Sequence, residues 1–148
     1  MTKRHGVDVR EIAYQSGEYR QSLDLRDDIL RKPIGLCLFD EDLSAEADDV
    51  HIAAMSGETL VGILVLTRVS ETCVQMRQVA VRESDRGGGI GQAMVVFSEE
   101  TARSAGYSEM MLHARKAAVD FYLKLGYAVR GGEFTEVGIP HFEMHKAL

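Results

Sequence analysis

The segment from Arg86 to Gly91 is the part of the sequence whose residue types and spacing point most directly to chemistry. It reads Arg-Gly-Gly-Gly-Ile-Gly and lies between a predicted strand ending at Val81 and a predicted helix. Glycines adopt positive φ and let a ligand approach the backbone closely, and the free amides at a helix N-terminus attract anions. The segment therefore predicts a phosphate-binding turn, with a plain strand-to-helix connection as the alternative.

Two common phosphate motifs do not fit this turn. A P-loop has a lysine after its last glycine, whereas Gln92 follows Gly91. A dinucleotide fingerprint starting at Gly87 needs a glycine where Gln92 stands, and its acidic residue would be Glu109, which begins the next strand instead of ending it. A nicotinamide-dependent oxidoreductase is therefore disfavoured.

Hydrophobic periodicity and turn residues predict the elements that position the glycine turn. In chain order they are a short edge strand with Val7, Val9 and Ile12; a helix capped by Ser16 and ended by Lys32-Pro33; a loop over 35–49; strands over 50–55, 60–69 and 72–81; a helix from Ile90 to Gly106; a strand with Met110, Leu112 and Ala114; a helix over 118–125; and two short strands around Gly131-Gly132 and Gly138-Ile139-Pro140. The three middle strands form an antiparallel meander, and the later strand-helix-strand crossover requires one parallel pair. The expected fold class is α/β (α+β), with a mixed, mostly antiparallel central sheet flanked by helices.

The third strand of the meander carries an irregularity. Val74 and Met76 alternate with polar residues, but the next apolar pair, Val79 and Val81, is shifted by one residue. Strand side chains repeat every two residues, so a β-bulge between Arg77 and Val79 would accommodate the shift. A strand buried on both faces is the alternative.

The composition is that of an ordinary globular protein and limits the functional classes. The 148 residues are 45% hydrophobic and 27% charged, and we expect a single domain over 1–148. A net charge of -6 argues against a nucleic-acid or anionic-membrane partner and slightly favours a cationic substrate. The sequence has neither a run of about 18 apolar residues nor a signal-peptide pattern, so a cytoplasmic location is expected. Cys37 and Cys73 lack metal-site spacing and are expected to be small buried hydrophobes, with no metal cofactor.

Several of these segments resemble the GNAT family of N-acetyltransferases. Arg86-x-x-Gly89-x-Gly91, following a strand that ends Val79-Ala80-Val81, looks like that family's coenzyme-A pyrophosphate motif. The run from Ala117 to Tyr127 is similar to the family's second signature. A narrower resemblance, to the ElaA-like branch, is carried by the tail over 134–141 with Met144 and Lys146, and by Leu25-Arg26, Leu30 and the segment 33–36. The resemblance implies an acyl-CoA N-acyltransferase (GNAT) fold with acetyl-CoA as cosubstrate.

The resemblance also implies roles for individual residues. Backbone amides from Arg86 to Gly91 would hold the pyrophosphate, and the backbone of Val79 to Val81 would pair with the pantetheine arm, where the family has a bulged strand. Arg115 stands where relatives often have Asn or Gln near the pantetheine. The predicted cofactor contacts are Val79, Ala80, Val81, Arg86, Gly87, Gly88, Gly89, Ile90, Gly91, Gln92, Arg115 and Phe121.

The expected reaction is direct attack of a neutral primary amine, on a small molecule or peptide, upon the thioester in a ternary complex. A backbone amide near Val79 would stabilise the oxyanion. Tyr122 matches the tyrosine that often protonates the leaving thiol in the family, and its place on an apolar helix face also fits plain packing. Many relatives carry a carboxylate in the strand before the loop, where this chain has Arg77 and Gln78. The remaining candidates for the general base are His141, which is favoured, and His51, His113 and Asp48-Asp49.

Two aspects of function stay open at this point. A non-catalytic acyl-CoA sensor on the same fold is the alternative to an enzyme, because a fold and a cofactor site do not fix activity. The sequence does not identify the acceptor or the length of the acyl group, although the segments 35–49 and 131–141 are expected to line the acceptor pocket. The family likeness also suggests a homodimer.

Overall fold

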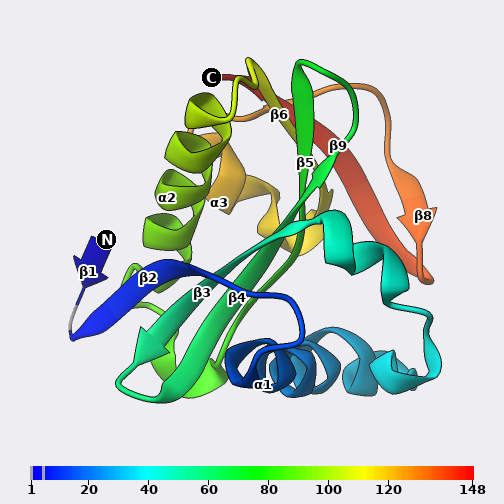
Figure 1. Ribbon diagram of the computed structural model, residues 1–148. Helices are drawn as coiled ribbons and strands as arrows, with labels where there is room; N and C mark the ends of the chain where they lie inside the picture. The colour runs from blue at the N-terminus through cyan, green and yellow to red at the C-terminus, as the bar shows by residue number, and fades with distance from the viewer. Residues whose placement is uncertain (1, 5) are drawn as a thin grey trace.

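The fold is a mixed sheet flanked by helices on both faces (Figure 1). A computed structural model describes residues 2–4 and 6–148. The strands are β1 (Thr2–Arg4), β2 (Val7–Ile12), β3 (Val50–Ser56), β4 (Thr59–Arg68), β5 (Cys73–Val81), β6 (Glu109–Arg115), β7 (Ala128–Val129), β8 (Phe134–Glu136) and β9 (Ile139–Ala147), and the α-helices are α1 (Gly17–Arg26), α2 (Ile90–Ser104) and α3 (Val119–Lys124).

The strand order is β1-β2-β3-β4-β5-β6-β9-β7, with β8 also pairing with β9. Every pairing is antiparallel except that of β5 with β6, which α2 connects by a crossover. A chain that leaves one strand and returns to a parallel neighbour needs such a crossover. The predicted meander, the single parallel pair and the mostly antiparallel sheet are therefore confirmed.

The two ends of the sheet differ from the sequence prediction. β2 is not an edge strand, because β1 pairs with its outer side. The tail forms three strands instead of two, and β9 is nine residues long and lies between β6 and β7. Proline is tolerated near the start of a strand, and β9 runs through Pro140 to Ala147.

Local signals set the helix boundaries. The Ser16 hydroxyl accepts a hydrogen bond of 3.1 Å from the Tyr19 amide and caps α1. The helix continues as a wider turn over Asp27–Arg31 and a 3-10 turn over Lys32–Ile34, and ends at Gly35. The predicted loop over 35–49 holds two short 3-10 turns.

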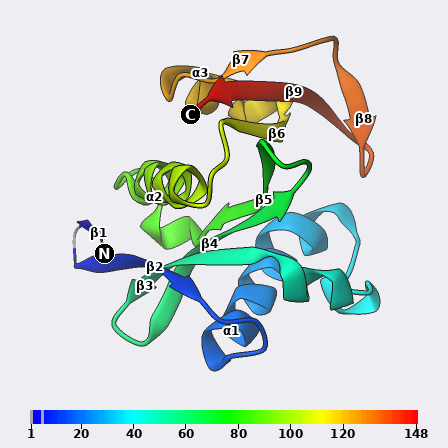
Figure 2. The ribbon, with the colours of Figure 1, turned by 45° about the horizontal axis from the view of Figure 1, so that its top comes forward.

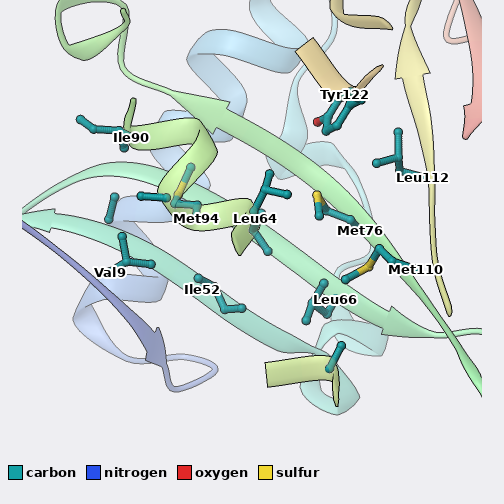
Figure 3. Packing of buried hydrophobic residues seen from close by; sticks show 14 of the residues in the cluster. Val9, Ile52, Leu64, Leu66, Met76, Ile90, Met94, Met110, Leu112 and Tyr122 are labelled. Atoms are coloured by element: carbon teal, nitrogen blue, oxygen red, sulfur yellow. The ribbon is translucent and has the colours of Figure 1, made fainter. Parts of the chain in front are cut away.

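The core lies on both faces of the sheet. Figure 2 shows α1 on one side of the strands and α2 on the other, and Figure 3 shows residues of the cluster on the α2 and α3 face. Successive strand residues point to opposite faces, so neighbouring residues such as Ile52 and Ala53 belong to different clusters. On one face the strands pack against α2 and α3, and on the other against α1. The first cluster includes Val9, Ile52, Leu64, Met94 and Tyr122, and the second includes Ile12, Tyr19, Leu25, Ala53 and Ile63.

β5 contains the predicted bulge. The register of β4 with β5 runs from Ile63↔Ala80 to Val65↔Arg77, so one residue of β4 lies opposite two of β5, Gln78 and Val79. Gln78, one of the two residues that form the bulge, has a φ of +57°, a value that few non-glycine residues adopt. The phase slip in the sequence is thus a β-bulge at Gln78.

A buried ion pair holds this bulge in place. Arg26 is 1% exposed, and its two terminal nitrogens donate to the Glu46 carboxylate at 2.8 and 2.6 Å. The Tyr19 hydroxyl donates to the same carboxylate at 2.8 Å. The remaining nitrogen, Arg26 Nε, donates to the Gln78 side chain at 3.3 Å. The network therefore ties α1 and the loop before β3 to the bulged residue.

We expect Arg26→Met to lower the free energy of unfolding by about 3 to 5 kcal/mol, because Glu46 would remain buried without its counter-ion. Urea unfolding measures this loss. Lys32→Met is the control, since Lys32 is exposed and pairs with Asp28 at the surface, and its midpoint should hardly change. Equal effects of the two substitutions would show that the buried pair does not support the fold.

Candidate functional site

A cleft opens where β5 and β6 separate. The two strands pair from Cys73↔Glu109 to Met76↔Leu112 and no further, although β5 runs on to Val81 and β6 to Arg115. The bulge at Gln78 begins just past the last pair. The cleft has a volume of about 340 Å³ and is lined by β5, β6, the end of the first helix, α3, β8 and β9.

Beyond the bulge, some backbone groups of β5 point away from β4. The Arg82 amide donates to the Val61 carbonyl at 2.7 Å, and backbone groups of successive residues point to opposite sides of a strand. The amide and carbonyl of Val81 therefore point away from β4, and the carbonyl accepts a hydrogen bond of 3.1 Å from Arg86 Nε. Val79 itself lines the cleft.

The glycine turn has the geometry of an anion site. Gly87 and Gly89 both have φ of +84°, a conformation that favours glycine. The Ala93 amide donates to the Gly89 carbonyl at 3.0 Å, which is the first bond of α2. The amides of residues 90–92 then have no acceptor within the helix. This leaves three donors at the positive end of the helix dipole.

Gly91, in the glycine turn, lies next to both β5 and α3. A Cβ atom placed on it would lie 3.4 Å from Phe121 Cζ and 3.9 Å from Val81 Cγ2, and its φ is not in the left-handed region. Ordinary van der Waals contact at these distances means that the protein alone does not require glycine here. The predicted contacts Gly91, Val81 and Phe121 are thus neighbours.

Tyr122 belongs to the core and also lines the cleft (Figure 3). Its side chain is 6% exposed and packs edge-on against Phe121 and Tyr127, with ring centroids 5.0 and 5.8 Å away. Among residues 2–4 and 6–148, its hydroxyl has no hydrogen-bond partner. Burial raises the pKa of Tyr122 to about 12. Tyr122 therefore packs in the core and also lines the cleft, and the phenol stays protonated at neutral pH.

His141 is 4% exposed and lines the cleft from β9. Its Nδ1 lies 2.8 Å from the Ile139 carbonyl oxygen, which can only accept, so Nδ1 carries a hydrogen. The neutral ring then has its lone pair on Nε2, which is 3.6 Å from Glu136 Oε2. The other oxygen of Glu136 lies 2.9 Å from His113 Nδ1. Glu136 thus stands between the two histidines of the cleft, a position that no sequence spacing indicated.

Of the other base candidates, His113 lines the main cleft, whereas His51 and Asp49 do not. The buried His51 contacts the Glu46 carbonyl at 2.8 Å and does not line the cleft. Asp49 lines a smaller adjoining cavity of about 170 Å³, and burial raises its pKa. The segment 35–49 accordingly contributes to that adjoining cavity, whereas Glu136, Val137 and His141 of the tail line the main cleft.

The structure adds detail to four further predictions. The Ala80 side chain is buried on the α1 face, and its backbone groups face β4, where Ala80 pairs with Ile63. Gln92 is exposed on the first turn of α2. Arg115 lines the cleft but donates to the Leu30 carbonyl at 3.3 Å. Cys37 is exposed and Cys73 half-buried, so the expectation of two buried cysteines was wrong.

The described residues place limits on other kinds of site. Within 2–4 and 6–148, no three His, Cys, Asp or Glu side chains are arranged to hold a metal ion. No helix in the same residues is long and apolar enough to span a membrane.

Comparison with known proteins identifies the family. A family model for the acetyltransferase (GNAT) domain matches residues 37–148. The chain belongs to the GNAT acetyltransferase family. The uncharacterized N-acetyltransferase YjcF of Bacillus subtilis is 29% identical to it, over 91% of this chain and 96% of YjcF.

Solved structures agree with the predicted GNAT fold. Escherichia coli ElaA has a TM-score of 0.78 at 20% identity, with 95% of this chain and 99% of ElaA covered. A GNAT family acetyltransferase from Elizabethkingia anophelis, with acetyl-CoA bound, has a TM-score of 0.73 at 15% identity, with 98% and 100% covered. These likenesses show the fold alone.

Family membership decides the enzyme class. The chain is an acetyl-CoA-dependent GNAT acetyltransferase, as its sequence predicted. The interpretations as a sensor without activity and as an oxidoreductase are set aside.

The raised pKa of Tyr122 predicts a pH dependence of stability for this GNAT protein. Above pH 10 an unfolded tyrosine loses its proton while buried Tyr122 keeps it, so folding becomes less favourable by up to about 1.4 kcal/mol per pH unit. Between pH 10 and 11, we expect the free energy of unfolding of Tyr122→Phe to fall by about 1 kcal/mol less than that of the wild type. Urea unfolding at both pH values measures this difference, and equal losses would contradict the assigned shift.

Proposed function

We propose that this enzyme transfers the acetyl group of acetyl-CoA to a primary amine of a small molecule or peptide, by direct attack in a ternary complex. The separation of β5 from β6 at the bulge carries the proposal, because it opens a cleft to both faces of the sheet. Cofactor groups and an amine then reach one point from opposite sides.

Each face of the sheet would hold one of the two substrates in the cleft. Tyr122 and Val81 pack on the α2 and α3 face, next to the glycine turn. Side chains alternate along β6, with Leu112 and Ala114 on that face, so His113 and Arg115 point to the α1 face. His141 is the cross-strand partner of Arg115 and shares its face. We assign acetyl-CoA to the first face and the acceptor to the second.

On the cofactor side, the amides of residues 90–92 and the helix dipole would hold the pyrophosphate. Those backbone groups of the segment from Val79 to Val81 that point away from β4 would pair with the pantetheine amides as an added strand does. Phe121 would cover the chain where it passes Gly91. These contacts place the thioester carbonyl beside the bulge, where the Val79 amide can donate to the developing oxyanion.

On the acceptor side, His141 fits the general base. An amine must lose a proton to attack and to form the amide product. Neutral His141 presents the lone pair of Nε2 to the cleft, and Glu136, 3.6 Å away, would stabilise the imidazolium that results. This orientation supports a proton-accepting role for the residue that the sequence favoured.

Tyr122 would assist the departure of coenzyme A. The sulfur leaves as a thiolate, whose conjugate acid has a pKa of about 8.5 by analogy with cysteine. Tyr122 is a weaker acid, with a pKa of about 12, so it first stabilises the thiolate as a hydrogen-bond donor. Its hydroxyl is free to do so because no described protein group occupies it.

Gly91→Ala tests the cofactor assignment without disturbing the fold. The added methyl group meets Phe121 at ordinary contact distance, so thermal stability should be kept. The methyl would hold the pyrophosphate off the amides, and we expect the Kd for coenzyme A to rise about tenfold, the loss of one good hydrogen bond. Calorimetric titration of acetyl-CoA and coenzyme A measures this change.

Gly132→Ala is the matched control, since its Cβ would meet open space outside the cleft. Unchanged affinity in Gly91→Ala would exclude the glycine turn as the phosphate site. Lack of coenzyme-A binding by the wild type would overturn the proposed function.

Tyr122→Phe tests the catalytic assignment. We expect kcat to fall about 100-fold with any amine that the wild type acetylates, because the thiolate loses its donor. The Kd for coenzyme A should stay within about twofold. Thiol release in single-turnover experiments measures the chemical step, and Tyr107→Phe, away from the cleft lining, is the control. An unchanged rate would reduce Tyr122 to a packing residue.

A further inference from the structure

Two arginines from different elements converge on one carbonyl oxygen at the acceptor end of the cleft. Arg31 follows α1 on the wider turn, and Arg115 ends β6. Arg31 Nη1 and Arg115 Nη2 each donate to the Leu30 carbonyl, both at 3.3 Å. Two like charges held this close repel each other, so an anion bound next to them would be favourable.

Of the two arginines, Arg115 has fewer partners for its charge. Arg31 Nε pairs with Glu41 at 2.7 Å. Arg115 is half-buried, and no carboxylate of the described residues lies within ion-pair distance of it. Burial, followed by the charge of Arg31, lowers the Arg115 pKa. Arg77, which donates to the Thr67 hydroxyl at 3.3 Å, adds another positive charge to the lining.

The pyrophosphate of the cofactor does not explain these charges. The glycine turn lies against Val81 at the far end of β5 and on the α2 face. Arg115 points to the α1 face, as the alternation along β6 requires, and meets the first helix there. An anion bound by Arg115 would therefore come with the acceptor.

We propose that the acceptor amine carries a carboxylate, which Arg115 binds with support from Arg31 while the amine lies toward His141. The inference rests on the proposed function. A guanidinium fork matches a carboxylate with two parallel hydrogen bonds. Arg115 and His141 are direct partners in the β6–β9 ladder and both line the cleft. The carboxylate and the amine of one small acceptor, such as a free amino acid, would then both lie in this cleft.

Matched pairs of probes test this proposal. Each free amino acid is compared with its own carboxamide, which keeps the amine and removes the negative charge. With acetyl-CoA, the wild type should show kcat/KM at least about tenfold higher for the carboxylates. Arg115→Gln should lose this preference while the KM for acetyl-CoA stays within about twofold. Lys116→Gln, which removes an exposed charge next along the chain, should keep the preference.

Binding provides a second readout that does not need turnover. Amino acids titrated into the enzyme loaded with coenzyme A should bind the wild type and Lys116→Gln, and bind Arg115→Gln about tenfold more weakly or not at all. The proposal is overturned if carboxamides or diamines bind and react as well as carboxylates. It is also overturned if no amino acid binds, or if Arg115→Gln raises the KM for acetyl-CoA instead. Failure of the proposed function is distinct from these results, since coenzyme A itself would not bind.

Discussion

The bulge at Gln78 is the constraint on which the cleft depends, and the buried pair of Arg26 and Glu46 holds it. A bulge shifts the pleat of β5 by one residue, so β6 cannot follow beyond Met76 and the strands part. Burying the two charges is costly, and such a pair is weak support for stability as such. Its value here is geometric, because the Arg26 contact fixes a non-glycine residue at positive φ and so the position of the Val79 amide.

Much of the fold could be predicted because its signals are local. The Ser16 cap, the tight turns of the meander and the phase slip before Val79 each depend on a few neighbouring residues. β9 was predicted too short because its apolar residues are few and alternate with histidines and acidic residues, a pattern with little hydrophobic contrast. β1 lacked a signal of its own, since its role is set by pairing with β2.

The parts of the candidate site that lie within one segment could be predicted from the sequence. The parts that form by contact between distant segments could not. The glycine turn and Tyr122 lie within recognisable runs, whereas Glu136 acquires its position only when β8 folds back on β9 and faces His113. The carbonyl of Leu30 and the Arg115 guanidinium meet across 85 residues of sequence. The same holds for Arg26 and Glu46. Such contacts follow from the sheet order, and no spacing in the sequence encodes them directly.

The net charge of the protein and the charges that line the cleft act over different distances. A protein with a net charge of -6 can therefore still bind the anionic substrates proposed here. Surface charges are screened in water over about 8 to 10 Å at physiological ionic strength, so the overall charge mainly affects how fast an anion approaches. Within the cleft the effective dielectric constant is lower and a guanidinium acts at contact distance. Arg115, without a carboxylate partner among the described residues, therefore decides which acceptor stays bound. The overall charge slightly favoured a cationic substrate, but it carries no information about a group bound at that distance.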